Sequence, residues 1–484
     1  MDVVIAIDAG TTGVRSRAVF SDGSDSISSY REFTQYFPQP GWVEHDAQEI
    51  WLAVLATLQD VTSQINQTIT AIGITNQRET IVAWNKQTGR PYGNAIVWQD
   101  RRTADRCIEL AENLPLVRQQ TGLVLDPYFS GTKIEWLLNN REIRQDDDLC
   151  IGTIDSWLIW NLTGSKSFVT DCTNASRTML FDITKLCWSK ELTNMLGVQT
   201  KFLPEVRASS GDFGITIQHG SVPAGISISG AAGDQHAALF GQACFDTGSA
   251  KNTYGTGSFV LMNVGKNCPS PRDGMLTTIA WQLGNDKPVY ALEGAIFVTG
   301  AAIQWLRDGL NIIDDASEIT ALAQSVNDSG GVVVVPAFTG LGSPWWDAYA
   351  RGAIFGITRG TSRAHIARAT IESIVFQTRD VVEAMSKASG VAITELKVDG
   401  GASVIDFMLQ LQADHLNVEV LRPKELETTA MGAAYLAGLA KGVWQSTQDI
   451  SAAWRLEKTF TPSTEPSGYE TWQTAVKRSM NWAR

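Results

Sequence analysis

The chain has 484 residues, more than one ordinary hydrophobic core accommodates, so two domains or three smaller ones are expected. Its 44% hydrophobic and 19% charged residues are typical of a globular protein, and no apolar run approaches the roughly 20 residues that cross a bilayer. A formal charge of -12 argues against nucleic acid as a partner, because that binding relies on clustered Lys and Arg. We therefore expect a cytoplasmic protein that captures any anionic ligand through backbone N–H groups, a few cations or a metal ion.

The first predicted element is a buried strand over residues 3–7, which runs into the turn Asp-Ala-Gly-Thr-Thr-Gly at 8–13 and a second strand at 18–20. Glycines and threonines between apolar strands form a tight hairpin whose N–H and hydroxyl groups converge, which suits a phosphate. Turns of this composition are more often only turns. Asp8 and Arg15 favour the phosphate, because a carboxylate can hold a hydrated cation and arginine binds phosphate oxygens in a fork.

A helix and two further strands follow. The sequence Asp-Ala-Gln-Glu at 46–49 resembles a capping box, and apolar residues at helical spacing continue behind it to residue 65. Strands are predicted at 71–75 and 80–84, with residues 76–79 turning between them. This alternation of helices and short strands indicates an α/β fold rather than a sandwich.

Four residues near these strand ends suit a neutral polyol. Arg78 and Glu79 place a donor fork beside an acceptor carboxylate, and vicinal hydroxyls both donate and accept; the alternative is a solvated surface pair. Trp98 could lie against the C–H side of such a ligand and Tyr128 could add a hydroxyl, although aromatic residues taken singly more often serve packing.

The segment 226–241 carries the most informative carboxylate. Ile226 and Ile228 predict a strand, and the small residues 230–233 predict a turn that a ligand or another backbone can approach closely. Asp234 then has two explanations of equal weight: the N-cap of a helix over 235–240, or a functional carboxylate held at a strand end.

The second half contains similar small-residue turns next to predicted strands. A glycine and threonine turn occurs at 255–258, and another glycine turn follows a strand at 399–403. The valine-rich run 331–335 predicts a strand buried on both faces, and 364–385 predicts a helix. A last helix over 428–439 is rich in alanine and glycine and should pack closely.

Small-residue turns after strands in both halves predict a duplicated α/β unit with nucleotide phosphates in the cleft between the halves. The chain has no G-x-x-x-x-G-K-[ST] motif, which excludes a P-loop enzyme, and no H-R-D with D-F-G, which excludes a protein kinase.

Two longer stretches carry a family resemblance. Residues 128–140, Y-F-S-G-T-K-I-E-W-L-L-N-N, and residues 352–372 match both signatures of the FGGY family of carbohydrate kinases, which the chain resembles almost from end to end. The resemblance implies an actin-like ATPase architecture, in which two ribonuclease-H-like domains, residues 1–243 and 244–484, close an interdomain cleft on ATP and a polyol. Stretches at 40–46, 73–80, 173–180 and 248–259 resemble members that act on glycerol, which implies transfer of the ATP γ-phosphate to its terminal hydroxyl, giving sn-glycerol 3-phosphate.

The resemblance also implies roles for individual residues. Asp234 would be the base that takes the hydroxyl proton, and Asp8 and Asp234 would lie at the Mg²⁺. The polyol pocket would be lined by Arg78, Glu79, Trp98, Tyr128, Asp234, Gln235 and Phe259. The nucleotide would be held by Gly10, Thr11, Thr12, Arg15, Thr256, Gly257, Gly300, Gln304 and Gly401.

Two rival functions stay open at this point: a kinase of the same family for a larger polyol or a ketose, and a non-catalytic actin-like nucleotide-binding protein. Ile405-Asp406 replaces the Asn-Asn usual in the family, which could loosen the nucleotide preference. A homo-oligomer, a dimer or a tetramer, is expected.

Overall fold

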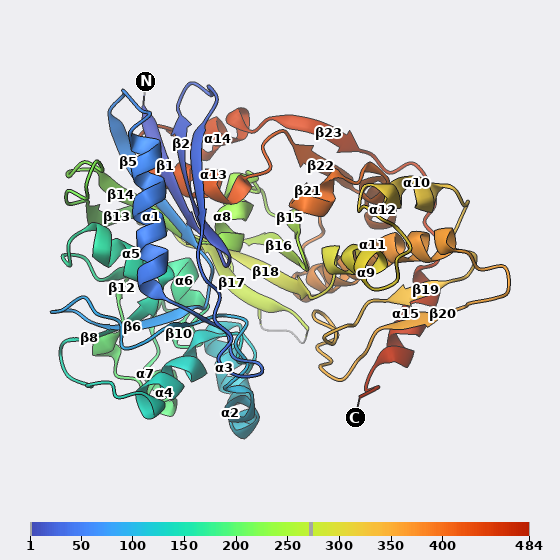
Figure 1. The fold of residues 1–484 in the computed structure, drawn as a ribbon, viewed down its shortest axis with the longest axis horizontal. Coiled ribbons are helices and arrows are strands. Elements are labelled where there is room, and N and C mark those ends of the chain that lie inside the picture. The colour runs from blue at the N-terminus through green and yellow to red at the C-terminus, as the bar shows by residue number, and fades with distance from the viewer. Residues whose placement is uncertain (1, 271–273, 484) are drawn as a thin grey trace.

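The computed structural model describes residues 2–270 and 274–483 and shows two α/β halves side by side, each built on a large sheet (Figure 1). The strands of the first sheet, in sheet order, are β13 (Ser210–Ile215), β14 (Ser227–Gly233), β5 (Ile69–Asn76), β1 (Val3–Ala9), β2 (Gly13–Phe20) and β3 (Ile27–Glu32). Of these, β1, β2 and β3 form an antiparallel meander, while β5 and β14 run parallel to β1.

The second sheet repeats this order. β15 pairs antiparallel with β16, and β16 with β18, while β21 and β22 continue parallel on the other side of β15. The predicted duplication of an α/β unit is therefore confirmed. The strands, in sheet order, are β17 (Leu276–Trp281), β18 (Val289–Ile296), β16 (Ser258–Gly265), β15 (Ser249–Tyr254), β21 (Glu395–Asp399), β22 (Glu419–Pro423) and β23 (Leu456–Phe460).

Two helices lie between the sheets, α8 (Asp234–Gly241) and α13 (Thr428–Ala440), and they pack on each other (Figure 1). α13 also packs on β5 and β14 of the first sheet, and α8 contacts β15, β16 and β17 of the second. One hydrophobic cluster accordingly contains residues of both halves. The domain boundary at residues 243 and 244 stays a prediction.

Small residues allow this close packing. A Cβ on Gly73 would lie 2.0 Å from the carbonyl oxygen of Ala433, and one on Gly230 would lie 2.5 Å from the backbone nitrogen of Ala437. The predicted close packing of the last alanine-rich helix is confirmed. The predicted turn at 230–233 is wrong, because these residues complete β14, and their small side chains make room for α13 rather than for a bend.

The predicted cap of α1 (Ala47–Thr62) is confirmed in part. Asp46 accepts a hydrogen bond from the backbone N–H of Gln48 at 2.7 Å. Glu49 does not complete a capping box, because its carboxylate accepts instead from the backbone N–H of Thr34 and the hydroxyl of Tyr36.

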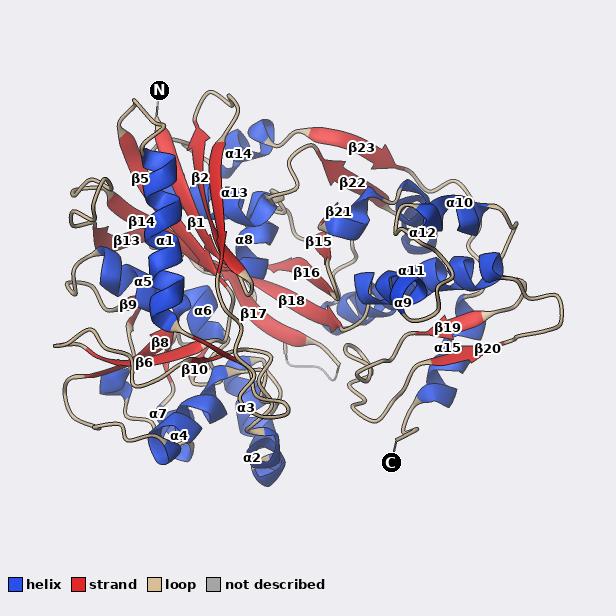
Figure 2. Ribbon diagram, in the orientation of Figure 1, coloured by secondary structure: helices blue, strands red, loops and turns tan. Residues whose placement is uncertain are grey.

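The remaining elements of the first half include a four-stranded sheet that lies below the first sheet (Figure 2). They are β4 (Glu44–His45), β6 (Ile81–Asn85), β7 (Ala95–Ile96), α2 (Ala104–Glu109), α3 (Leu114–Thr121), α4 (Ser130–Asn140), β8 (Leu149–Thr153), α5 (Ile154–Leu162), β9 (Val169–Asp171), α6 (Cys172–Ser176), β10 (Phe181–Asp182), β11 (Cys187–Trp188), α7 (Lys190–Met195) and β12 (Glu205–Arg207).

The second half adds helices around its sheet and a small separate sheet of β19 and β20 (Figure 2). These elements are α9 (Gly300–Asp308), α10 (Glu318–Gln324), β19 (Val333–Val335), β20 (Ala353–Phe355), α11 (Arg363–Ser389), α12 (Asp406–Leu416), α14 (Thr447–Ala453) and α15 (Tyr469–Ser479). The valine-rich strand is buried as predicted but is shorter, because Gly330 and Gly331 before it have φ angles of 60° and 79° and form a turn. In the described part of the chain, every helix is too short or too polar to cross a membrane.

Candidate active site

Three loops leave the first sheet at one edge. β1, β5 and β14 are parallel, and Ala9, Asn76 and Gly233 lie opposite one another in register. The predicted phosphate turn continues from Ala9, Arg78 and Glu79 come shortly after Asn76, and Asp234 follows Gly233. Ligands of open α/β sheets bind outside the carboxyl ends of parallel strands, so this edge is where a site is expected.

The second sheet is arranged in the same way. Thr253 in β15 lies opposite Asp399 in the parallel strand β21. The two glycine turns that follow these strands, at 255–258 and 399–403, therefore lie at one edge of this sheet. The turns predicted to hold nucleotide in the second half are brought together by strand register.

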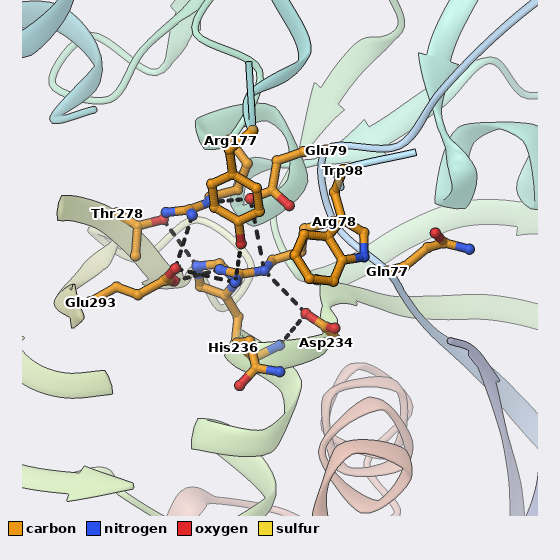
Figure 3. A network of polar contacts seen from close by, with 12 residues as sticks. Gln77, Arg78, Glu79, Trp98, Arg177, Asp234, His236, Thr278 and Glu293 are labelled. Carbon is orange, nitrogen blue, oxygen red and sulfur yellow. Dashed lines mark hydrogen bonds and ion pairs between the residues drawn. The ribbon is translucent and has the colours of Figure 1, made fainter. Parts of the chain in front are cut away.

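Asp234 is the first residue of α8 (Figure 3), and Gly233 is the N-cap of this helix. The alternative in which Asp234 is itself the N-cap is therefore wrong, because β14 extends to Gly233 and the helix begins one residue earlier than predicted. Its Oδ1 accepts from the backbone N–H of Gln235 at 2.7 Å and lies 3.1 Å from Nε of Arg78. No described residue donates to Oδ2, and the side chain is 29% exposed, so one carboxylate oxygen is held and the other is accessible.

Arg78 and Glu79 are buried, with side chains only 2% and 1% exposed, so the alternative of a solvated surface pair is wrong. Figure 3 shows Arg78 reaching between Asp234 and Glu293. One of its nitrogens also donates to the Tyr128 hydroxyl at 3.1 Å. Glu79 has a φ of 59°, an uncommon backbone conformation for a residue other than glycine, and such strain clusters at functional sites.

Two residues that were not predicted from the sequence complete this network. Arg177 donates from Nε to Glu79 at 2.7 Å and from Nη2 to Glu293 at 2.9 Å, and both Arg177 and Glu293 are fully buried. Arg177 lies in the stretch at 173–180 that carried the family resemblance, and Glu293 is a carboxylate inside an otherwise apolar strand. Both features can be seen in the sequence, but the partners of these residues lie about a hundred or more residues away in the chain, so the sequence does not show the contacts.

The electrostatics of Glu293 follow from its two arginine partners. Burial by itself would raise its pKa, but the guanidinium groups of Arg177 and Arg78 lower the pKa from 4.5 to about 2. Because the folded-state pKa lies below the unfolded value, Glu293 stabilises the folded protein above about pH 4.5, and this contribution disappears as the pH falls toward 2.

The variant Glu293→Gln should therefore be less stable than the wild type by an amount that depends on pH. We expect the difference in unfolding free energy to be largest at about pH 7 and smaller at about pH 4, since the wild-type carboxylate begins to lose its advantage below its unfolded pKa. Urea unfolding at the two pH values measures this. A difference that grows on acidification would contradict the assignment.

Aromatic rings form one side of the polar network. The ring of Trp98 lies edge-on to Tyr128, with centroids 5.6 Å apart, and to Phe259 of the second half at 6.4 Å. Indole Nε1 of Trp98 donates to the Thr11 hydroxyl at 3.0 Å, which links this wall to the phosphate turn. The predicted polyol residues from both halves thus lie around Asp234, together with Gln235, whose side-chain oxygen accepts from Lys251.

The first phosphate turn is closed by a hydrogen bond from the N–H of Gly10 to the carbonyl of Gly13 at 3.0 Å, and Thr12 is exposed at its tip. Arg15 lies opposite Asp8 in the β1–β2 register and forms an ion pair of 3.2 Å with Glu427 at the start of α13. The predicted phosphate-binding arginine is therefore within reach of the turn but is paired with a carboxylate.

Asp8 and Asp234 are the predicted metal ligands. Burial and the charges of Asp234 and Glu427 raise the pKa of Asp8 to about 7, and Arg15 opposes this. Among the residues that the structure describes, no group of three or more His, Cys, Asp or Glu side chains could hold a metal ion. Two carboxylates nonetheless fit Mg²⁺, which usually keeps several waters and takes one or two carboxylates plus substrate phosphates.

A cavity of about 560 Å³ opens beside the second-half turns. It is lined by four of the predicted nucleotide residues: Thr256, Gly300, Gln304 and Gly401. Gly257 is not on its wall; its Cβ position faces the carbonyl of Ile296 at 2.3 Å, so it serves the turn. The turn residues Gly10, Thr11 and Thr12 and the side chain of Arg15 are not on the wall either, because they belong to the first sheet.

Of the neighbouring residues Ile405 and Asp406, only one lies on the wall of this cavity. Ile405 lines it, whereas the Asp406 carboxylate accepts from Arg422 at 2.8 Å and Lys458 at 2.7 Å and is not part of the lining. The cavity also carries the apolar side chains of Ile303 and Val404. Its wall is thus largely apolar with a few polar groups, as is usual for pockets that bind small molecules or cofactors.

Gly401 allows a test of the cavity. No atom outside its chain neighbours lies within 4 Å of a Cβ built there, so Gly401→Leu should fold and fill space in the cavity. We expect the KM for ATP to rise about tenfold or more, with the acceptor KM and the Tm kept. Gly360→Leu is a matched control, because its Cβ would meet nothing closer than 3.8 Å and it lies outside the cavity. Equal effects of both variants on the KM for ATP would mean that the nucleotide does not bind in this cavity.

Comparisons with known proteins agree with this geometry. Residues 3–241 match the N-terminal domain of the FGGY family of carbohydrate kinases and residues 250–441 match its C-terminal domain. The chain is 53% identical to glycerol kinase of Symbiobacterium thermophilum over 99% of both chains, and 52% identical to glycerol kinase 2 of Thermotoga maritima over 100% of both.

A solved structure supports the same relationship. The crystal structure of Plasmodium falciparum glycerol kinase with ADP superposes with a TM-score of 0.94 at 36% identity, covering 99% of this chain and 98% of that chain. The predicted architecture of two ribonuclease-H-like domains is confirmed by this likeness and by the repeated strand order. The chain belongs to the FGGY family of carbohydrate kinases.

Proposed function

We propose that the protein is an ATP-dependent kinase that transfers the γ-phosphate of ATP to the terminal hydroxyl of glycerol, giving sn-glycerol 3-phosphate. The observation that carries this proposal is the sequence identity of 53% and 52%, over almost the full length of the chain, to relatives named glycerol kinase. The buried Arg78 and Glu79 beside Asp234, at the edge where three parallel strands end, support it independently.

The polyol would be bound by a small set of side chains with complementary roles. Arg78 donates and the carboxylate of Glu79 accepts, which suits hydroxyl groups that do both. Trp98 and Phe259 offer ring surface to the C–H side of the carbon chain, and Tyr128 adds a hydroxyl. Because Arg78 and Glu79 are locked by Glu293 and Arg177, little side-chain entropy would be lost when a ligand binds.

Asp234 would act as the base. A carboxylate is too weak to ionise an alcohol beforehand, so it orients the hydroxyl and receives its proton as the new bond to phosphorus forms. The contacts of Oδ1 with Arg78 and Gln235 hold the carboxylate in place, and Oδ2 is available for the proton. Phosphoryl transfer needs alignment and charge stabilisation more than covalent help, which matches this equipment.

The nucleotide would span the two sheets. Its nucleoside would occupy the cavity at Gly300, Gln304 and Gly401, and its phosphates would meet Thr256 and the turn at residues 10–12. Asp8 and Asp234 would hold Mg²⁺, which when bound neutralises charge on the transferring phosphoryl group. Arg15 would exchange Glu427 for a phosphate, because its present ion pair is partly exposed and such pairs contribute little.

Two alternatives follow from the same fold. A kinase for a larger polyol or ketose would need space that the ring contacts of Trp98 with Tyr128 and Phe259 do not favour. A non-catalytic nucleotide-binding protein would have no need of a partly exposed carboxylate held beside a buried arginine. As further parts of the proposal, the protein acts in the cytoplasm as a dimer or tetramer.

The experiment is ADP release by the purified protein with ATP and Mg²⁺, with and without glycerol. The proposal expects release to depend on glycerol and to cease on chelation of Mg²⁺ by EDTA. The absence of any release would favour the non-catalytic alternative, and release that does not depend on glycerol would contradict the proposed acceptor.

A further inference from the structure

Lys251 is a buried cation at the edge of the site to which neither the sequence nor the proposed mechanism assigns a role. It lies in β15 with no exposed surface, and its ammonium donates to the Gln235 side-chain oxygen and to the Thr253 hydroxyl, the latter at 2.9 Å. No acidic side chain of the described residues forms an ion pair with it. A buried charge without an ion pair is costly, and such groups concentrate at functional sites.

The contact with Lys251 decides how the amide of Gln235 is oriented. A glutamine amide has an oxygen that accepts and a nitrogen that donates, whereas a lysine ammonium only donates. The oxygen of Gln235 must therefore face Lys251, and Nε2 must face the other way. No described residue accepts a hydrogen bond from Nε2, so this donor is left for a ligand.

The position of Gln235 places that donor in the site. Gln235 follows Asp234 in the first turn of α8, and its backbone N–H donates to the Asp234 carboxylate at 2.7 Å. The acceptor hydroxyl that loses its proton to Asp234 would thus lie near an amide group whose free end can only donate. Glu79 supplies the opposite chemistry, because its carboxylate only accepts.

We propose that Lys251 is a positioning residue, which holds the Gln235 amide so that Nε2 donates to a hydroxyl oxygen of the phosphoryl acceptor. This rests on the proposed function, since it assumes a hydroxyl-bearing acceptor beside Asp234. Lys251 acts through Gln235 and does not itself touch the acceptor.

Lys397 provides a matched control. It lies directly opposite Lys251 in the β15–β21 register and is also buried, but its ammonium donates to the carbonyl of Ala243 and pairs with Glu395, away from the site. Lys397→Met changes the same residue type in the same sheet. It should leave the acceptor KM unchanged, whatever it does to stability.

The test is a double-mutant cycle of Lys251→Met and Gln235→Ala, run with the acceptor that the wild type turns over fastest. Lys251→Met alone should raise the KM for that acceptor about tenfold, because the amide loses its fixed orientation. In the Gln235→Ala background the same change should have no further effect on this KM. Additive effects on KM, or an equal effect of Lys397→Met, would overturn the inference.

Gln235→Glu decides the matter if Lys251→Met does not fold. A glutamate there keeps an oxygen on Lys251 and gains an ion pair, but it loses the Nε2 donor. We expect the Tm to be kept or raised and the acceptor KM to rise about tenfold. An unchanged KM would show that Nε2 does not contact the acceptor and would overturn the inference. If glycerol is not the acceptor, the proposed function fails while the cycle still decides the role of Lys251.

Discussion

Replacing Asp234 by asparagine is expected to lower kcat for glycerol phosphorylation about 10²- to 10⁴-fold, the range that a positioned general base contributes. The amide keeps the shape of the carboxylate and can still accept from the Gln235 N–H, but it cannot receive the hydroxyl proton. Because the cavity that we assign to the nucleoside lies beside the second-half turns, the affinity for ADP should change little. Steady-state kinetics and ADP titration measure both quantities.

Asp46→Asn is the matched control for this experiment. It also neutralises one carboxylate at the start of a helix, but Asp46 caps α1, where its carboxylate accepts from the backbone N–H of Gln48. We expect its kcat to equal that of the wild type. If Asp234→Asn kept wild-type kcat, Asp234 would not be the base.

The second large effect concerns stability. Arg177→Met should lower the free energy of unfolding by about 3–5 kcal/mol, because it leaves the buried carboxylates of Glu79 and Glu293 with one arginine partner fewer. The KM for glycerol should rise as well, since Arg177 orients the Glu79 carboxylate. Chemical unfolding and acceptor kinetics at temperatures below the lowered Tm measure the two effects.

The control is Arg31→Met, which removes an ion pair with Asp60 in which both side chains are about half exposed. Exposed pairs contribute roughly 0–1 kcal/mol, so this variant should unfold almost like the wild type. Similar losses in both variants would mean that the buried network does not stabilise the protein in the way its geometry indicates.

Most of the fold could be predicted from local sequence patterns. The strands at the N-terminus, the glycine turns of the second half and the alanine-rich helix were predictable, because apolar runs, turn residues and helical spacing are properties of neighbouring residues. The errors concerned tertiary packing. Residues 230–233 look like a turn, and only the presence of α13 on that face explains why a strand is made of glycine and alanine there.

The same distinction applies to the site. Arg78, Glu79 and Asp234 could be proposed because each follows a strand and carries a polar group suited to a polyol. Arg177 and Glu293 could not be joined to them, since the contact from Arg78 to Glu293 spans 215 residues of sequence and depends on how the two sheets face each other. The pairing of Arg15 with Glu427 was equally inaccessible, because α13 returns from the second half to reach it.

The central claim is that the site around Asp234 phosphorylates glycerol, and a panel of acceptors tests it most directly. Purified protein with ATP and Mg²⁺ would be assayed by coupled ADP release on glycerol, a tetritol, a pentulose and a hexose, with the product of the glycerol reaction identified by its stereospecific oxidation. We predict the highest kcat/KM on glycerol and a product that is sn-glycerol 3-phosphate. A higher kcat/KM on the tetritol or the pentulose would contradict the claim.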